Sequence, residues 1–161
     1  MRRMATVVSA AAIVLLTAGL VSAQTPNFSG KWTCSDCPAP GGGGGGGGRG
    51  GGGGGLGPEF TATQDATTLK IDRTMGENTV SMVYKLDGSE SKNMAMGRGG
   101  QTEQVSKAAW TGGKLVISTT IPNGVRTMTL SMEGGSLVVE TLAPGRDGGP
   151  GTPVKRTYKK G

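Results

Sequence analysis

The chain has 161 residues, a formal net charge of +6 and 32 glycines, but only two cysteines and no histidine. The absence of histidine excludes a Ser-His-Asp or Cys-His catalytic unit and any histidine-ligated metal centre. The carboxylates are scattered singly, so no acid pair indicates general acid–base chemistry. We therefore expect a protein that is not an enzyme and that needs no cofactor.

The first 23 residues predict a cleaved signal peptide. Arg2 and Arg3 precede an apolar run over residues 10–21, and Ala23 ends a short series of small or modest side chains before Gln24. The run is too short for a stable membrane span, which takes about 20 residues. We expect cleavage near Ala23–Gln24 and a periplasmic or secreted mature protein. Export, together with the interleaving of acids and bases, argues against a nucleic-acid partner.

Residues 24–40 predict a first strand that is followed by the motif Cys34-Ser35-Asp36-Cys37. In an oxidising compartment, two cysteines with none left over favour one disulfide. The alternatives are a redox pair or a metal site. A redox pair is expected at a helix N-terminus, whereas here Pro38-Ala39-Pro40 and polyglycine follow. A zinc site takes four ligands, and the motif offers two sulfurs.

Residues 41–57 form a glycine tract that only Arg49 and Leu56 interrupt. Glycine loses the most backbone freedom on ordering, and the tract offers no side chains to bury. A phosphate-binding loop would need Gly-Lys-Ser/Thr before a helix, which is missing. The tract is predicted to be a flexible loop.

The remainder, residues 58–161, alternates apolar and polar side chains with a period of two, as strands with one buried face do. The alternating positions are Leu69, Ile71 and Arg73; Val80, Met82, Tyr84 and Leu86; Leu115, Ile117, Thr119 and Ile121; and Met128, Leu130 and Met132. Hairpin signals separate these runs at Asp87-Gly88, Gly112-Gly113, Asn123-Gly124 and Gly134-Gly135. With residues 24–40, this predicts one all-β domain, an antiparallel up-and-down meander barrel of 8–10 strands. A β-sandwich is the alternative, but it would need longer crossovers.

The methionines of the mature chain suggest either ordinary core filling or a deformable pocket for an apolar ligand, because thioethers adapt to irregular surfaces. They are Met75, Met82, Met94, Met96, Met128 and Met132.

Two short motifs indicate a family. Phe28-Ser29-Gly30-Lys31-Trp32 resembles the Phe-x-Gly-x-Trp opening strand of the calycins, the superfamily of lipocalins and fatty-acid-binding proteins. Arg156-Thr157-Tyr158 resembles the Arg-x-Tyr closing strand of the fatty-acid-binding proteins, and the layout is similar to small secreted lipocalin-like proteins of bacteria. The resemblance implies that Trp32 packs, beside Gly30, across the closed end of the barrel under a basic side chain of the last strand.

The resemblance also implies a ligand site. Arg156 and Tyr158 would point inward and hold a ligand carboxylate, and a guanidinium suits that geometry. Arg126 shares a strand face with Met128, which makes it a second candidate cation, and Met82 and Tyr84 would complete the lining. The function expected is non-catalytic binding of a small amphipathic or fatty-acid-like carboxylate. The alternative is an envelope interaction or structural module with a filled core, because the Cys-x-x-Cys motif and polyglycine stand where fatty-acid-binding proteins carry a helical lid.

Overall fold

The computed structural model describes residues 25–37, 55–75, 78–97, 100–145, 148–149 and 151–161. The predicted signal peptide and most of the glycine tract lie outside these residues. The described chain forms ten strands: β1 (Gly30–Cys34), β2 (Glu59–Gln64), β3 (Thr68–Met75), β4 (Asn78–Lys85), β5 (Glu90–Gly97), β6 (Gly100–Thr111), β7 (Lys114–Ile121), β8 (Gly124–Glu133), β9 (Ser136–Leu142) and β10 (Val154–Lys160). Within these ranges, no helix is long and apolar enough to cross a membrane.

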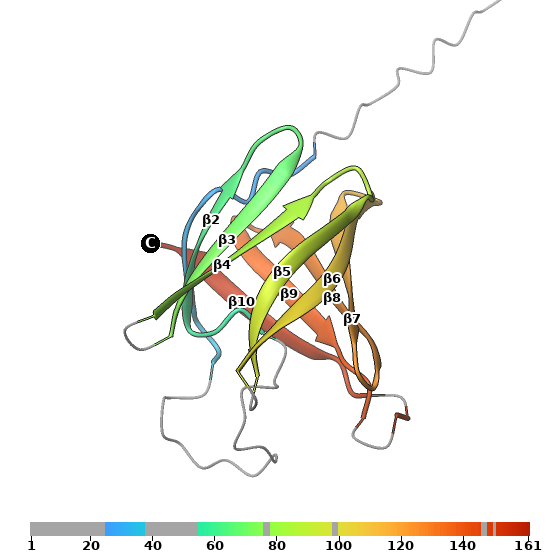
Figure 1. Ribbon diagram of the computed structural model, residues 1–161. Coiled ribbons are helices and arrows are strands. Elements are labelled where there is room, and N and C mark those ends of the chain that lie inside the picture. Colours follow the sequence, from blue (N-terminus) through green and yellow to red (C-terminus); the bar gives the residue numbers. More distant parts are fainter. Residues whose placement is uncertain (1–24, 38–54, 76–77, 98–99, 146–147, 150) are drawn as a thin grey trace, which may run out of the picture.

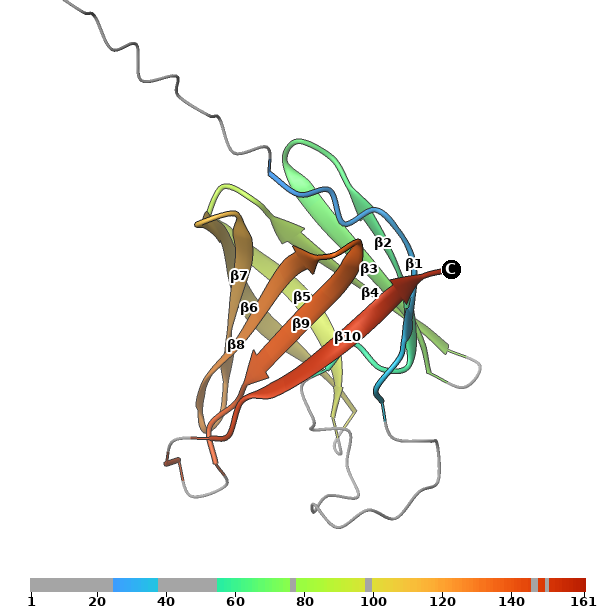
Figure 2. The ribbon, with the colours of Figure 1, turned by 180° about the vertical axis from the view of Figure 1, so that it is seen from behind.

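The strands form one antiparallel sheet in the order β4-β3-β2-β1-β10-β9-β8-β7-β6-β5. Strands that follow one another in sequence are paired everywhere except at β4 and β5, and the first strand, β1, pairs with the last, β10. The sheet curls until its edge strands, β4 and β5, face each other (Figures 1 and 2). This confirms the predicted all-β meander, as a nearly closed barrel of ten strands, and excludes the sandwich alternative.

Side chains of β5 bridge the seam between β4 and β5. The Asn93 amide accepts the Val83 N–H at 2.7 Å and donates to the Val83 carbonyl at 2.9 Å. One pair further along, Ser91 Oγ accepts the Lys85 N–H at 2.8 Å. These polar side chains stand in for part of a backbone ladder, because they satisfy both backbone groups of Val83 and the N–H of Lys85 at the edge of β4.

Alternation along the strands places one apolar face inside the barrel, and the inward side chains form one core. Its fully buried members with the largest side chains are Trp32, Tyr158, Phe28, Leu56, Leu69, Ile71, Leu115, Ile117, Leu130, Leu137 and Val139. We call the end where β6 finishes and β7 begins the tryptophan end, since Trp110 lies there with Phe28 stacked on it at 5.7 Å. We call the opposite end, where β2, β8 and β10 begin, the arginine end.

Two expectations from the sequence are wrong. Leu56, placed in a loop with nothing to bury, is only 2% exposed and belongs to the core. The end of the glycine tract folds against the barrel, where burial of Leu56 and hydrogen bonds to the Gly55 and Gly57 carbonyls together hold it. Met94 is 46% exposed, because the neighbouring Asn93 takes the inward position and turns Met94 to the outer face.

Candidate functional site

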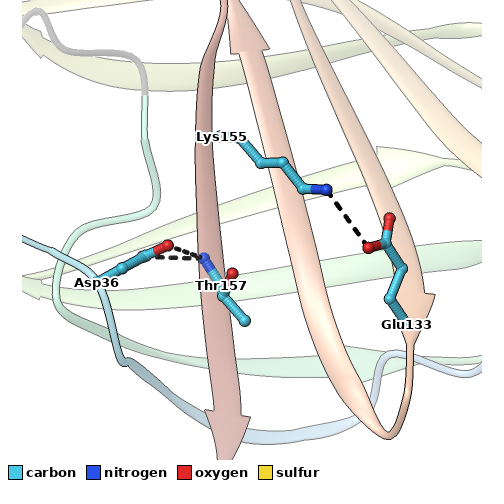
Figure 3. Close-up of polar contacts among 4 residues, drawn as sticks. All are labelled: Asp36, Glu133, Lys155 and Thr157. Atoms are coloured by element: carbon cyan, nitrogen blue, oxygen red, sulfur yellow. Dashed lines mark hydrogen bonds and ion pairs between the residues drawn. The ribbon is translucent and has the colours of Figure 1, made fainter.

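The barrel separates its lysines from its arginines. Five ion pairs lie on the outer face of the described chain, and each joins a lysine to an acid. Figure 3 shows one of them, Lys155 with Glu133 at 3.3 Å. No arginine of the described chain takes part in such a pair. The positive charges inside the barrel therefore have no acidic counter-charge among the described residues.

Arg73 is the most enclosed of these arginines. It follows Ile71 on the inward face of β3, and its Nη1 donates to the Gly55 carbonyl at 2.9 Å. Its Nε is buried without a hydrogen-bond partner. Burial lowers the pKa of Arg73, the nearby hydroxyl of Tyr84 opposes that shift, and the charge of Arg126 adds to it. A guanidinium with a buried, unpaired donor and a like charge beside it is poorly satisfied, and an anion would relieve both deficits.

Arg126 lies on β8, which four strands separate from β3 in the sheet order, and it lies at the same end of the barrel. Its cross-strand partner is Thr119 of β7, which is buried and shares a 2.9 Å hydrogen bond with Ser106 of β6. Its Nη2 donates to Gln104 Oε1 at 3.3 Å, a long bond to a neutral acceptor. The wall formed by β6, β7 and β8 is therefore polar beside Arg126 and apolar further inward, where Met128 is buried.

Two tyrosines complete the polar group. Tyr84 is buried, and its hydroxyl lies 3.3 Å from Met82 Sδ. Burial raises the pKa of Tyr84, and the charges of Arg126 and Arg73 oppose that rise. Tyr158 is also buried, and its hydroxyl donates to the Gly57 carbonyl at 3.0 Å. Both phenols stay protonated at neutral pH, so they offer hydrogen bonds to an acceptor and no charge.

Arg156 lies at the rim and is held by the segment that leaves β1. It shares the inward face of β10 with Tyr158, since its cross-strand partner is the buried Val139. Its Nη1, however, donates to the Asp36 carbonyl at 3.1 Å. The Asp36 carboxylate in turn accepts the Thr157 N–H at 2.9 and 3.1 Å and so continues the β1–β10 ladder with a side chain (Figure 3).

A disulfide closes this segment. Cys34 and Cys37 are bonded with a Cα–Cα distance of 5.6 Å, so neither is free to ligate a metal in this state. The four-residue ring holds Asp36 against β10, and disulfides of this kind persist in oxidising compartments. In this bonded state the ring brings Asp36 to the Thr157 N–H.

The tryptophan end is packed by side chains. Trp32 is buried, its Nε1 donates to the Phe28 carbonyl at 2.8 Å, and Lys160 Nζ lies 6.0 Å from the ring centroid. Gly30 has φ +141°, and a Cβ at this position would lie 2.6 Å from Lys160 Cε. Glycine at this position leaves room for the end of the Lys160 side chain, which extends from the paired strand β10.

The structure brings together most of the residues that the sequence singled out, and it adds one. The charge of Arg126 opposes the rise in the pKa of Tyr84, and Tyr158 lies at the same end of the barrel. Arg156 lies at the rim, where its guanidinium is bonded to the Asp36 carbonyl. Arg73 was missed as a site residue although it ends the apolar alternation of β3. An arginine on an otherwise apolar strand face indicates an inward cation. That pattern holds for Arg73 as it does for Arg126, but only Arg126 was predicted from it.

A scan against protein-family models and a search of curated protein sequences found no match. The structure matches solved structures, among them the zebrafish ileal bile-acid-binding protein in complex with cholic acid. The fold is similar to that of a bile-acid-binding protein. The TM-score is 0.51 at 24% identity, over 64% of this chain and 72% of the other. At this level of identity the likeness shows the fold alone, a nearly closed antiparallel β-barrel, and the chemistry must be argued from the residues of this chain.

Proposed function

We propose that this protein is a non-catalytic barrel that binds a small amphipathic carboxylate at its arginine end. One observation carries the proposal: two inward guanidinia, Arg73 and Arg126, face the core without an acid among the described residues. Burying such charges unpaired is costly, so an anionic ligand accounts for their retention. The Tyr84 hydroxyl is within electrostatic range of both and would donate a hydrogen bond to the same carboxylate, while Met82 and Met128 would meet its apolar part.

The fold neighbour supports a binding role. That neighbour is a binding protein in complex with cholic acid, a carboxylate with a large apolar body. In this chain, Arg156 and Tyr158 were expected to grip the head group directly. With Arg156 engaged by Asp36, we assign the main contacts to Arg126 and Arg73, and to Arg156 a supporting contact at the rim.

A matched pair of ligands tests the proposal. The full chain is titrated with dodecanoate and with dodecanol, which differ in the charged head group alone. We expect dodecanoate to bind at least about tenfold more tightly, because hydrogen bonds between charged groups contribute about 1.5–3 kcal/mol. The variant Arg126→Met is expected to lose this preference, and the outer-face variant Lys155→Met to keep it. Equal affinities for the two ligands would refute an anion site.

The second candidate is an envelope interaction or structural module with no small ligand. The burial of Leu56 inside the barrel favours it, because that side chain already fills part of the interior. Failure of both dodecanoate and dodecanol to bind, with the barrel intact by circular dichroism, would support this reading.

We also propose that the protein is exported. The positive start and apolar run of residues 1–23 support a signal peptide, and the disulfide is compatible with an oxidising compartment. The N-terminal sequence of the mature protein tests this directly. It is expected to begin at Gln24, and a protein that retains Met1 in the cytoplasm would contradict the prediction.

A further inference from the structure

The last residues of the glycine tract lie inside the barrel and engage the polar groups of the candidate site. We call this segment, Gly55–Gly57, the plug. The Gly55 carbonyl accepts from Arg73 Nη1 at 2.9 Å, and the Gly57 carbonyl accepts from the Tyr158 hydroxyl at 3.0 Å. Between them, the Leu56 side chain is buried in the barrel core. The plug thus presents two oxygen acceptors and one branched apolar group.

That combination is what the proposed ligand would present: acceptor oxygens for the same donors and an apolar part for the same core. We propose, resting on the proposed function, that the plug is a built-in competitor for the site. A carboxylate ligand binds by expelling Leu56 and by taking the donors of Arg73 and Tyr158 from the two plug carbonyls. Affinity is then set by the difference between two occupants of one space.

The contacts make this exchange favourable at the polar groups. Gly55 offers Arg73 a neutral carbonyl and leaves the buried Nε of that side chain unpaired. A carboxylate accepts from two guanidinium nitrogens at once, and bonds between charged partners are stronger than those to a neutral acceptor. The exchange therefore removes Leu56 from the core, but the apolar part of the ligand fills the same space. At the same time it gives Arg73 a better hydrogen-bond partner.

The segment next to the plug provides a pivot. The Pro58 carbonyl accepts the Cys34 N–H at 2.8 Å, so the chain is anchored where β2 begins. Gly57, directly before it, has φ +86°, and no atom lies within 4 Å of a Cβ built there. Glycine can leave this conformation for many others at little steric cost. Rotation at Gly57 would withdraw Leu56 while β1 and β2 remain paired.

The inference is tested by the direction in which one substitution changes the affinity for a ligand. The full chain and its variants Leu56→Ala and Leu115→Ala are titrated with a dansyl-labelled undecanoic acid as the probe. Leu115 is an equally buried leucine at the tryptophan end, so it controls for a general loosening of the core. We expect Leu56→Ala to bind the probe about tenfold more tightly, because a competitor loses its buried group, and Leu115→Ala to bind no more tightly than the wild type.

The outcomes separate the two proposals. If the wild type binds and Leu56→Ala binds equally or more weakly, the plug is part of the wall and the inference is wrong, while the proposed function stands. Binding by Leu56→Ala alone supports both proposals. If no variant binds, the proposed function fails and this inference fails with it.

Hydrogen exchange on the wild-type chain provides a second measurement that needs no substitution. Ligands ordinarily slow amide exchange at the residues they cover. With saturating dodecanoate, we expect exchange in the peptide that contains Leu56 to become faster and exchange in β3 and β10 to become slower. Slower exchange at Leu56 would overturn the inference even if Leu56→Ala does not fold.

Discussion

Replacing Arg73 with methionine is expected to stabilise the protein while it weakens ligand binding. The guanidinium makes one hydrogen bond, to Gly55, its Nε has no partner, and Arg126 places a like charge nearby. Substituting well-packed apolar groups for buried charges is often stabilising, by about 1–4 kcal/mol. The lost hydrogen bond offsets about 1 kcal/mol of this. This leaves a net gain between about 0 and 3 kcal/mol, and we expect a value near the middle of that range, about 1–2 kcal/mol.

For a domain of this size, each kcal/mol shifts the melting temperature by roughly 3–5 °C, so Arg73→Met should melt about 3–10 °C higher than the wild type. Thermal unfolding followed by circular dichroism measures this shift. Lys155→Met, which removes an exposed ion pair with Glu133, is the matched control, and its stability should change by no more than about 0.5 kcal/mol. Dodecanoate binding should fall about tenfold in Arg73→Met alone. A melting temperature clearly below that of the control would show that the bond to Gly55 outweighs the buried charge, and would refute the reasoning.

Three further predictions concern the frame of the barrel. The backbone N–H groups and hydroxyls of Thr67 and Thr68 hold the pKa of Asp65 at about 2, below its unfolded value, so this carboxylate contributes stability above pH 4 that is lost as the pH falls toward 2. Unfolding midpoints measured over that range should therefore depend less on pH in Asp65→Asn than in the wild type. The same pH dependence in both proteins would contradict this. Replacing Cys34 and Cys37 with serine should lower the free energy of unfolding in urea by about 2 kcal/mol, because the unfolded chain gains loop entropy and Asp36 is no longer held against β10. An unchanged midpoint would show that the disulfide does not stabilise the fold. Trp32→Ala should lose about 3–5 kcal/mol in the same assay, because it opens a cavity at the tryptophan end; a loss below 1 kcal/mol would mean that this end closes without the indole.

Much of the fold could be predicted because the information is local. Period-two alternation in β3, β7 and β8 specifies strands, and Gly112-Gly113 and Gly134-Gly135 specify tight turns between them. With short turns, each strand pairs with the next, so the meander follows almost without tertiary knowledge. The β4–β5 seam did not follow, because the amide of Asn93 replaces a ladder only once the sheet has curled and the two edges meet.

The candidate site was predicted less completely, because its pairing depends on contacts between distant residues. Arg126 and Tyr84 could be placed on inward faces from the alternation of their strands, and Tyr158 from the resemblance of the last strand to that of fatty-acid-binding proteins. Alternation cannot show that Asp36, 120 residues away in sequence, captures Arg156. Nor can it show that Leu56 enters the core, since a glycine tract carries no periodicity to read.

By itself, the sequence of this protein determined most of the strands, the tight turns and the face on which the side chains of the alternating strands lie, because these follow from steric preferences and burial within a few residues. Only the tertiary structure decided which inward donors are satisfied and by what: Gly55 at Arg73, Gly57 at Tyr158 and Asp36 at Arg156. Those partners come from segments far apart in the chain, and curling of the sheet is what brings them within hydrogen-bond distance.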